Sequence, residues 1–439
     1  MRTVRIGAGA GFSGDRIDPA VELAAKGSIG WLVFECLAER TIALAQKARL
    51  LNPDAGYDPL LEERMEAVLP LCARQHIRIV TNMGAANPVA AMFRTRDIAR
   101  RLGISGLRIA AVTGDDVLSF VRNAADGELA GVPPEKRIAA NAYLGAEPIV
   151  EALAGGADIV LTGRVADPSM FLAILMHEFG WPTDNWNLLG QGTVVGHLLE
   201  CAGQLTGGYF ADPGCTDVPG LARLGFPIAE VTEDGRATFT KVEGSGGRIT
   251  RATCTEQLLY EVQDPSAYIT PDVIADFSRV SIEEAGADRI RVQGAAGRPQ
   301  PEKLKVSVGF HDGYVGEGQI SFAGPGSLAR AQLAQAILRE RLRSYSLCDL
   351  RFDLIGVSSI AGEILPISSC VPCEVRLRAA GRSPSEKIAS MVPREVEALY
   401  TNGPAAGGGV FRSVKETIGV LSTFIPRASV STAVHYEVS

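Results

Sequence analysis

The feature that most constrains the fold of this chain is a regular alternation of short apolar runs and amphipathic runs over residues 1–165. The apolar runs, rich in Val and Ile, are expected to be strands at 4–6, 31–35, 77–82, 107–112, 138–142 and 158–162. The amphipathic runs between them are expected to be helices at about 18–26, 38–51, 59–74, 88–102 and 146–155. Apolar strands are typical of sheets buried on both faces, and strand–helix alternation implies right-handed crossovers and parallel pairing. We therefore expect an α/β fold with an N-terminal doubly wound, mostly parallel sheet and helices on both of its faces.

The pattern changes after about residue 206. Runs rich in glycine, proline and aspartate separate short alternating segments, such as 237–242 and 248–254, which are typical of antiparallel strands. Long helices are expected at about 326–344 and 384–400. We therefore expect two domains, an α/β domain at 1–215 that carries the site and an α+β domain with antiparallel strands at 216–439.

Composition narrows the classes of partner. The formal net charge is −7, whereas duplex binding normally needs a basic face, so nucleic acid is not expected. No apolar run approaches the ~18 residues of a membrane helix, so no membrane partner is expected. The eight cysteines lack the spacing of a disulfide framework, and the first residues run directly into a strand without a secretion signal. These features favour a cytoplasmic protein with reduced thiols.

A glycine-rich loop follows the first predicted strand. Glycine lets the backbone approach a ligand closely and present its N–H groups to an anion. Gly9-x-Gly11-x-x-Gly14 matches the dinucleotide fingerprint, and Glu35 ends the next strand where a ribose-binding acid would lie. In that fingerprint, however, the glycines run straight into the helix, whereas here three residues intervene before Asp18. We favour a loop that cradles another anion, a carboxylate or a phosphate, over a nicotinamide or flavin site; a purely structural turn remains the alternative.

Polar residues follow all six predicted strands. In a parallel sheet these strand ends share one edge, where open α/β sheets bind their ligands. We assign catalysis there to Asp15, Glu35, Glu39 and Arg164. We assign substrate binding to Gly9, Gly11, Ser13, Gly14, Arg16, Cys36, Arg40, Asn82, Gly84, Asn87, Asn141, Tyr143, Gly163 and Asp167.

The chemistry of these side chains motivates the assignment. Glu35 and Glu39 are four residues apart and share a face if they are helical; paired carboxylates can move protons, or can hold Mg²⁺ or Ca²⁺ together with an oxygen of Asn82. The alternative is a helix start enriched in acids, which favours the helix dipole. The guanidinium groups of Arg16 and Arg164 match a substrate carboxylate or phosphate.

Cysteine and histidine give weaker signals. Cys36 is either a thiol activated near a helix N-terminus or a buried thiol, and His197 with Cys201 is either a core pair or a dyad. Cys370 and Cys373 have redox spacing without the strand–helix setting of redox proteins. The chain has no HExxH motif, nucleophile elbow or Walker loop, so zinc proteases, α/β-hydrolases and P-loop enzymes are not expected.

Seven segments together resemble the acyclic terpene utilisation protein AtuA family. They are GAGFSGDR (9–16), FECLAERT (34–41), TNMGAANP (81–88), ANAYLGA (140–146), TGRVADPS (162–169), GGYFADPG (207–214) and TNGP (401–404). The resemblance covers nearly the whole chain. It implies a soluble bacterial protein of catabolic operons for citronellol-like terpenes or related branched acids, whose neighbours handle CoA thioesters. Many relatives carry an extra C-terminal domain of ferredoxin-like fold; this chain is expected to lack it, and a separate small subunit would supply it.

The leading hypothesis is a lyase, a hydratase or dehydratase, acting on a branched or hydroxylated carboxylate or its CoA thioester. Loop amides and arginines would bind the acidic group and stabilise an enolate-like charge, while Asp15, Glu35 or Glu39 moves the proton. The rival enzyme is an NAD(P)- or nucleotide-dependent oxidoreductase. The non-enzyme alternative is a binding or scaffold subunit of a catabolic complex. A homo-oligomer is expected in each case.

Overall fold

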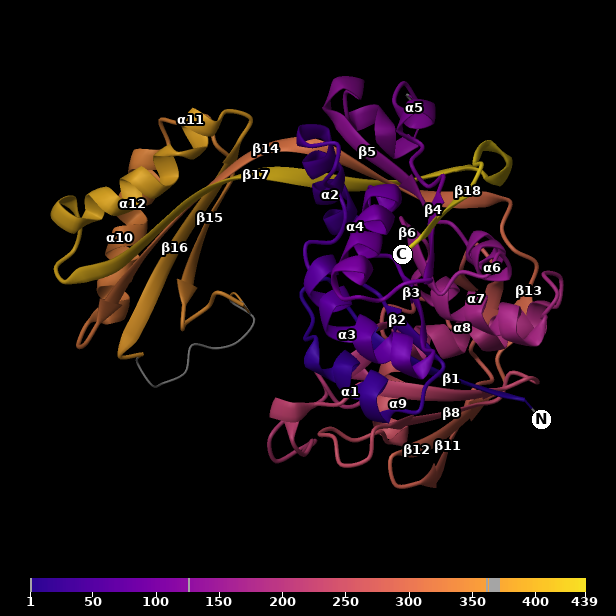
Figure 1. Ribbon diagram of the computed structural model, residues 1–439. Coiled ribbons are helices and arrows are strands. Elements are labelled where there is room, and N and C mark those ends of the chain that lie inside the picture. Colours follow the sequence, from indigo (N-terminus) through magenta and orange to yellow (C-terminus); the bar gives the residue numbers. More distant parts are fainter. Residues whose placement is uncertain (1, 125–126, 361, 363–371) are drawn as a thin grey trace. The chain divides into compact units, whose positions relative to one another are not determined.

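The computed structural model describes residues 2–124, 127–360, 362 and 372–439, which form two compact units (Figure 1). The main unit comprises Met1–Gly309 and Val420–Ser439, and the inserted unit comprises Phe310–Gly419. The predicted boundary after residue 215 differs from this division. Strands that follow residue 215 pair with the first strand of the chain, so they belong to the core of the main unit.

The centre of the main sheet is parallel, as the alternating pattern predicts. Its members are β1 (Thr3–Ala10), β2 (Trp31–Phe34), β3 (Arg78–Thr81), β6 (Ile159–Thr162) and β4 (Arg108–Thr113), in that spatial order. Their inward side chains are apolar and buried, as in Ile6, Val33 and Val160. Five of the six strands predicted for this sheet are therefore confirmed.

Antiparallel strands extend this sheet on both sides, so the sheet is mixed rather than mostly parallel. On one side are β7 (Pro227–Thr232), β8 (Ala237–Lys241), β12 (Arg289–Gln293) and β11 (Ser281–Gly286). On the other side β18 (Ala433–Val438) pairs with β4. An α/β class with antiparallel strands in the second half is confirmed, and a doubly wound arrangement stays a prediction. The strand expected at 248–254 is wrong, because Thr250 caps the helix Arg251–Leu259 there.

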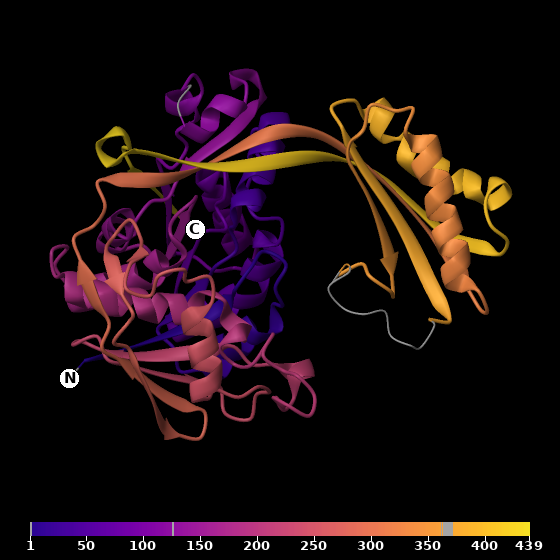
Figure 2. The same cartoon turned by 180° about the vertical axis from the view of Figure 1, so that it is seen from behind.

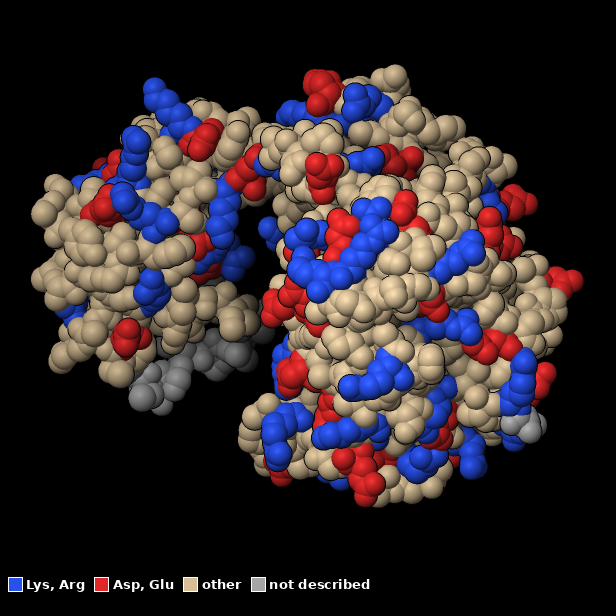
Figure 3. All heavy atoms as spheres, viewed as in Figure 1, with Lys and Arg blue, Asp and Glu red and all other residues tan. Residues whose placement is uncertain are grey.

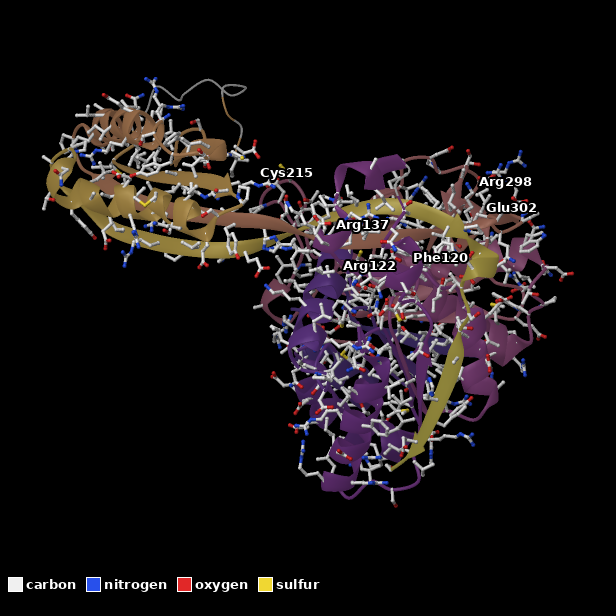
Figure 4. All side chains as sticks on the ribbon, turned by 90° about the horizontal axis from the view of Figure 1, so that it is seen from above. Phe120, Arg122, Arg137, Cys215, Arg298 and Glu302 are labelled. Carbon is white, nitrogen blue, oxygen red and sulfur yellow. The ribbon has the colours of Figure 1, made fainter. Side chains whose placement is uncertain are left out.

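The remaining predicted strand, at 138–142, lies outside this sheet. β5 (Arg137–Ala142) pairs instead with β14 (Lys303–Ala323), because its small side chains pack against Leu304, Val306 and Val308. The buried guanidinium of Arg137 holds the segment before β5 in place, close to Arg122 (Figure 4). It donates to the backbone carbonyls of Val121, Arg122, Ala124, Leu129 and Val132.

Two groups of helices cover the main sheet. The first is α1 (Asp18–Lys26), α3 (Leu61–Gln75) and α4 (Pro88–Arg101), and the second is α6 (Glu147–Ala154), α7 (Asp167–Phe179) and α8 (Trp186–Glu200). Nearly every residue of α7 and α8 is buried, and together with the strands they form the largest hydrophobic core. Three glycines allow the close packing of α8: Gly190, Gly192 and Gly196.

The inserted unit has a topology of its own. Its strands are the distal part of β14, β15 (Cys348–Ile355), β16 (Glu374–Ser383) and the first part of β17 (Gly407–Pro426), with the spatial order β15-β16-β14-β17. Helices α10 (Ser327–Leu342) and α12 (Met391–Asn402) pack against β16 and lie along one side of these strands (Figure 2). The order β-α-β-β-α-β with antiparallel neighbours is the ferredoxin-like arrangement. A unit of this type therefore lies within the chain, before β18.

Charge is distributed without a dominant sign on the face drawn in Figure 3, where basic and acidic side chains lie interspersed over both units. Within the inserted unit, for example, Arg378 bridges Glu317 at 2.7 Å and Asp353 at 2.8 Å.

Among the described residues, none of the helices has the length and apolar composition needed to cross a bilayer.

The packing of α8 generates a stability prediction. A Cβ added at Gly196 would lie 2.6 Å from the carbonyl oxygen of Pro168 and 2.7 Å from its Cα. Alanine gains about 1 kcal/mol of helix propensity over glycine, whereas overpacking against backbone costs about 1–3 kcal/mol, so Gly196→Ala should lower the free energy of unfolding. Urea unfolding followed by tryptophan fluorescence measures this, because Trp31, Trp181 and Trp186 all lie in the main unit.

Gly30 provides the matched control for this substitution. A Cβ at Gly30 meets nothing within 4 Å, so Gly30→Ala should change the unfolding free energy by less than about 0.5 kcal/mol. Equal effects of the two substitutions would contradict the close packing of α7 against α8.

Candidate functional site

A cavity of about 1150 Å³ opens in the main unit where several predicted strand ends meet. Its wall comes from the loop after β1, the segment after β2, the C-terminal end of α8, and residues 268–271 and 303–305. Small-molecule sites typically occupy about 300–1,000 Å³, so the cavity accommodates a metabolite of substantial size.

The cavity collects many of the predicted site residues. Those in its wall are Gly11, Ser13, Gly14, Asp15, Arg16, Glu35, Cys36, Glu39, Tyr143, Arg164 and Asp167. The other predicted residues, all within the described part of the chain, lie outside the wall: Gly9, Arg40, Asn82, Gly84, Asn87, Asn141 and Gly163. The loops after β1, β2, β5 and β6 thus each contribute residues to the wall, whereas Asn82, after β3, supports it from behind.

Glu35 is a buried carboxyl group in the wall of the cavity. Its residue is 8% exposed, and its Oε1 accepts from the backbone N–H of Leu37 at 2.8 Å and from Asn82 Nδ2 at 2.9 Å. Burial raises the pKa of Glu35 from 4.5 to about 7, although the charge of Arg164 and these two hydrogen bonds lower it. A carboxyl group with a pKa near neutrality can both give and take a proton.

Helix α2 (Glu39–Leu51) begins at Glu39, so Glu35 and Glu39 do not share a helix face as predicted. Burial alone would raise the pKa of Glu39, but the Tyr143 hydroxyl donates to it and Lys305 approaches it at 3.2 Å, which lower the pKa to about 2. Glu39 is therefore a fixed negative charge at neutral pH, unlike Glu35.

The glycine loop is already occupied by a carboxylate of its own. Asp15 Oδ2 accepts from the backbone N–H of Gly11 at 2.9 Å, and Asp15 Oδ1 accepts from that of Arg16 at 2.8 Å. The N–H of Asp15 itself donates to the carbonyl of Phe12. These three amides are engaged within the loop, so they do not hold an external anion. Burial raises the pKa of Asp15, whereas the hydrogen bonds from the backbone N–H groups of Gly11 and Arg16 lower it.

The close approach at Gly11 explains part of the glycine pattern. A Cβ there would lie 2.6 Å from the backbone carbon of Cys201, so the glycine lets the loop contact the end of α8. Gly9 lies inside β1, and its missing side chain leaves room for Phe34. The resemblance to a dinucleotide fingerprint is thus accounted for by packing.

Arg64, in α3, fixes the same loop from beneath. Its guanidinium has no exposed surface and donates to the backbone carbonyls of Ser13 at 2.7 Å and Asp15 at 3.2 Å. It also forms an ion pair with buried Asp58 at 3.2 Å and donates to the sulfur of Cys36 at 3.3 Å. One buried cation therefore ties together the loop after β1, the end of β2 and α3.

Cys36 does not have the character of a nucleophile. The thiol is buried, and burial raises its pKa well above the ordinary value, although the charge of Arg64 lowers it. Because the thiolate is the reactive form, this thiol stays protonated and unreactive at neutral pH. Cys373 is described and exposed, whereas Cys370 lies outside the described residues.

Arg164 lines the cavity, but its donors are engaged by the protein. Its Nε and Nη2 donate to the carbonyl of Val165 at 2.9 and 2.6 Å, Nη1 donates to the carbonyl of Leu37, and Nη2 pairs with Asp167. Its guanidinium carbon also lies 4.5 Å from the ring centre of Tyr143. Arg164 therefore supplies positive charge beside Glu35 rather than a free fork for a substrate. Arg16, which is partly exposed, pairs with Asp18.

Most of the predicted residues outside the wall make hydrogen bonds or close contacts that hold the wall residues in place. Asn82 is buried; its Nδ2 donates to Glu35, and its Oδ1 accepts from the N–H of Cys36 at 2.7 Å. Asn141 donates to buried Asp115, whose carboxylate would meet a Cβ at Gly163 at 2.5 Å. Gly84 makes a similar close approach to the carbonyl of Thr162.

Two predicted residues lie elsewhere. Asn87 is the N-cap of α4, where its Oδ1 accepts from the N–H of Ala90. Arg40 is exposed on α2 and does not reach the wall.

Sequence reasoning missed Arg64, Glu200 and the lysines at 303 and 305, all of which bear on the cavity. Glu200 ends α8, is 8% exposed, and pairs through Oε1 with His197 Nδ1 at 2.9 Å. The available signal was a single acidic residue on an otherwise apolar helix. The partner of His197 is thus Glu200 rather than Cys201.

The predicted divalent-metal site finds no support in the arrangement of side chains. The oxygen of Asn82 already accepts a hydrogen bond, and Glu39 is engaged by Tyr143 and Lys305. Within residues 2–124, 127–360, 362 and 372–439, no three His, Cys, Asp or Glu side chains gather closely enough to hold a metal ion.

The buried Arg64–Asp58 pair generates the second prediction. Arg64→Met should lower the free energy of unfolding by about 3–5 kcal/mol, because it leaves Asp58 buried without a partner. Asp58→Asn in the Arg64→Met background should recover part of this loss, and urea unfolding of the four proteins of the cycle measures the coupling.

Arg94 is the matched control, since it pairs with Glu62 from the neighbouring helix with its side chain 39% exposed. Arg94→Met should cost less than about 1 kcal/mol. A loss at Arg64 no larger than at Arg94 would show that the loop does not depend on the buried cation.

Comparison with known proteins agrees with the motifs in the sequence. The model of the family described as acyclic terpene utilisation family protein AtuA matches residues 4–436, which is nearly the whole chain. No curated protein and no solved structure matches the chain. A match of this extent spans both units and every loop of the cavity. The chain therefore belongs to the AtuA family, which is implicated in the utilisation of acyclic terpenes.

Proposed function

We propose that the protein is a catabolic lyase, a hydratase or dehydratase, that acts on a branched or hydroxylated carboxylate or on its CoA thioester. The observation that carries this proposal is the carboxyl group of Glu35, buried in the wall of a large cavity with its pKa raised to about 7. Adding or removing water next to an acyl group requires a proton transfer at carbon and another at oxygen, and a group of this pKa serves either transfer near neutral pH. Membership of a family implicated in terpene utilisation supports a catabolic role.

The surroundings of Glu35 support its part in the reaction. Asn82 and the N–H of Leu37 both hold Oε1, which fixes the orientation of the carboxyl group. The charge of Arg164 stabilises the ionised form, so that the pKa lies near neutrality rather than far above it. The group is thus oriented and able to change protonation state at low cost.

Positive charge in the wall suits the acidic end of such a substrate. Arg16, Lys303 and Lys305 line the cavity, and Lys305 Nζ lies 4.8 Å from the ring centre of Tyr143. We assign to these cations the binding of the carboxylate, or of the thioester carbonyl as it acquires enolate-like charge. Apolar wall residues such as Leu224 and Phe226 would contact the branched hydrocarbon part.

A nucleotide-dependent oxidoreductase is less well supported. The amides of Gly11 and Arg16 already donate to Asp15, so they cannot also hold a pyrophosphate.

The third prediction concerns activity. Glu35→Gln should lower turnover of a β-methyl-branched enoyl-CoA by about 10²–10⁴-fold, because glutamine keeps the hydrogen-bonding shape but cannot transfer a proton. The loss of the conjugated thioester absorbance measures hydration, with the free enoic acid as a parallel probe.

Glu63, exposed on α3, provides the control, and Glu63→Gln should keep wild-type turnover. Wild-type protein that hydrates neither probe and does not dehydrate the corresponding 3-hydroxyacyl compounds would refute the proposal, as would a fully active Glu35→Gln variant.

The fourth prediction concerns stability against pH. Because burial raises the pKa of Glu35 from 4.5 to about 7, the folded protein binds this proton more tightly than the unfolded chain does. The resulting stabilisation is complete below pH 4.5 and is lost as the pH rises through 7. Relative to Glu35→Gln, the wild type should therefore lose about 3 kcal/mol of unfolding free energy across this window, at about 1.4 kcal/mol per pKa unit. Urea unfolding of both proteins across the window measures the difference, and parallel curves would contradict the raised pKa.

A further inference from the structure

We propose that Glu200 is the second acid/base residue of the cavity and that His197 positions it, so that Glu35 and Glu200 act as a pair. This inference rests on the proposed function, because it names the group that completes the two proton transfers. It stands on the geometry of the C-terminal end of α8.

Glu200 lines the cavity and has one carboxylate oxygen without a hydrogen-bond partner in the described part of the chain. The residue is 8% exposed and lines the same cavity as Glu35. Its Oε1 lies 2.9 Å from His197 Nδ1, whereas its Oε2 is buried and has no hydrogen-bond partner among the described residues. A buried acceptor without a partner is costly, and proteins rarely keep one without a reason. A substrate proton or hydroxyl in the cavity would supply the missing partner.

His197 holds Glu200 in one orientation. Its Nε2 lies 3.3 Å from the backbone carbonyl of Leu258, which can only accept, so Nε2 carries a proton. Its ring packs against both Tyr268 and Phe277, with ring centres 5.1 and 5.7 Å away. Nδ1 is therefore left to face Glu200, where it accepts a proton from the neutral acid or donates one to the carboxylate. A proton can therefore lie on either His197 or Glu200 without a change in the position of these two side chains.

The charges around Glu200 favour one shared proton in the cavity. Burial raises the pKa of Glu200, whereas the charge and hydrogen bond of His197 lower it. The other groups that face Glu200 are Glu35, Arg164, Cys201, Glu261 and Tyr268. The charge of Glu200 in turn raises the pKa of Glu35. Two carboxyl groups that influence each other in this way tend to hold one proton and one negative charge between them.

A pair in this state performs a balanced elimination of water. The ionised carboxylate removes the proton from the carbon next to the acyl group, and the electrons of that C–H bond form the double bond. The neutral acid gives its proton to the hydroxyl group at the next carbon, whose C–O bond breaks to release water. One carboxyl group has gained a proton and the other has lost one, so proton exchange with solvent restores the starting state. Hydration follows the same steps in reverse.

The experiment measures the titration of Glu35 with and without Glu200. The difference in unfolding free energy between a protein and its Glu35→Gln derivative, followed against pH, gives the midpoint at which Glu35 loses its proton. Glu200→Gln removes the neighbouring charge and should lower this midpoint by about one pH unit. Glu256→Gln, which removes an exposed charge from the neighbouring helix α9 (Arg251–Leu259), should leave it unchanged. An unchanged midpoint in Glu200→Gln would overturn the pair.

His197→Gln gives an independent test if Glu200→Gln does not fold. Loss of the imidazole raises the pKa of Glu200, so Glu200 carries less negative charge at a given pH and the midpoint of Glu35 should again fall. A merely structural histidine would weaken folding without moving this midpoint.

Activity on the branched enoyl-CoA separates the two proposals. Glu200→Gln should lower kcat by about 10²-fold or more with little change in KM. Loss of activity in Glu35→Gln with full activity in Glu200→Gln would overturn the pair and leave the lyase intact. If Glu200→Gln lowers the midpoint of Glu35 but the wild-type protein has no hydratase activity, the coupled carboxylates are supported and the lyase is refuted.

Discussion

The cavity depends on a positive charge that has no access to water. The guanidinium of Arg64 is enclosed by the carbonyls of the loop after β1, the carboxylate of Asp58 and the sulfur of Cys36. Without it, Asp58 would be buried alone and the loop carbonyls would lose their donor. Since that loop also contacts the end of α8 through Gly11, the same cation connects the segment after β2 with the helix that ends at Glu200.

The sequence could predict the elements of the main unit because its apolar runs are unambiguous. It could not predict the neighbours of every strand, since the small side chains of β5 suit either the parallel sheet or the partner β14 that it has. The antiparallel extension beyond β1 was likewise hidden, because alternating strands after residue 215 read equally well as a separate domain. Pairing over such distances along the chain depends on the assembled core rather than on local pattern.

The candidate site was predictable to the extent that strand ends share an edge. Glu35, Asp15 and Tyr143 were found because they follow strands, and all three reach the cavity. Arg64 was missed because it lies in a helix among Glu62, Glu63 and Glu66, where an arginine ordinarily faces solvent. Asp15 shows the opposite difficulty: its position was predicted, but its carboxylate binds the loop amides that an external anion was expected to take. The residue type was correct for an anion site, and the protein itself provides the anion.

The pairing of β18 with β4 bears on how the chain is synthesised. β18 completes the edge of the main sheet, yet ribosomes make it only after residues 310–419. Until then β4 has an unpaired backbone edge, a state in which nascent chains tend to associate with one another. Rapid folding of the inserted unit, whose βαββαβ topology is closed within itself, would shorten the delay by bringing β17 and then β18 back promptly. The folding rate of the inserted unit would thus influence how soon β18 pairs with β4 during biosynthesis.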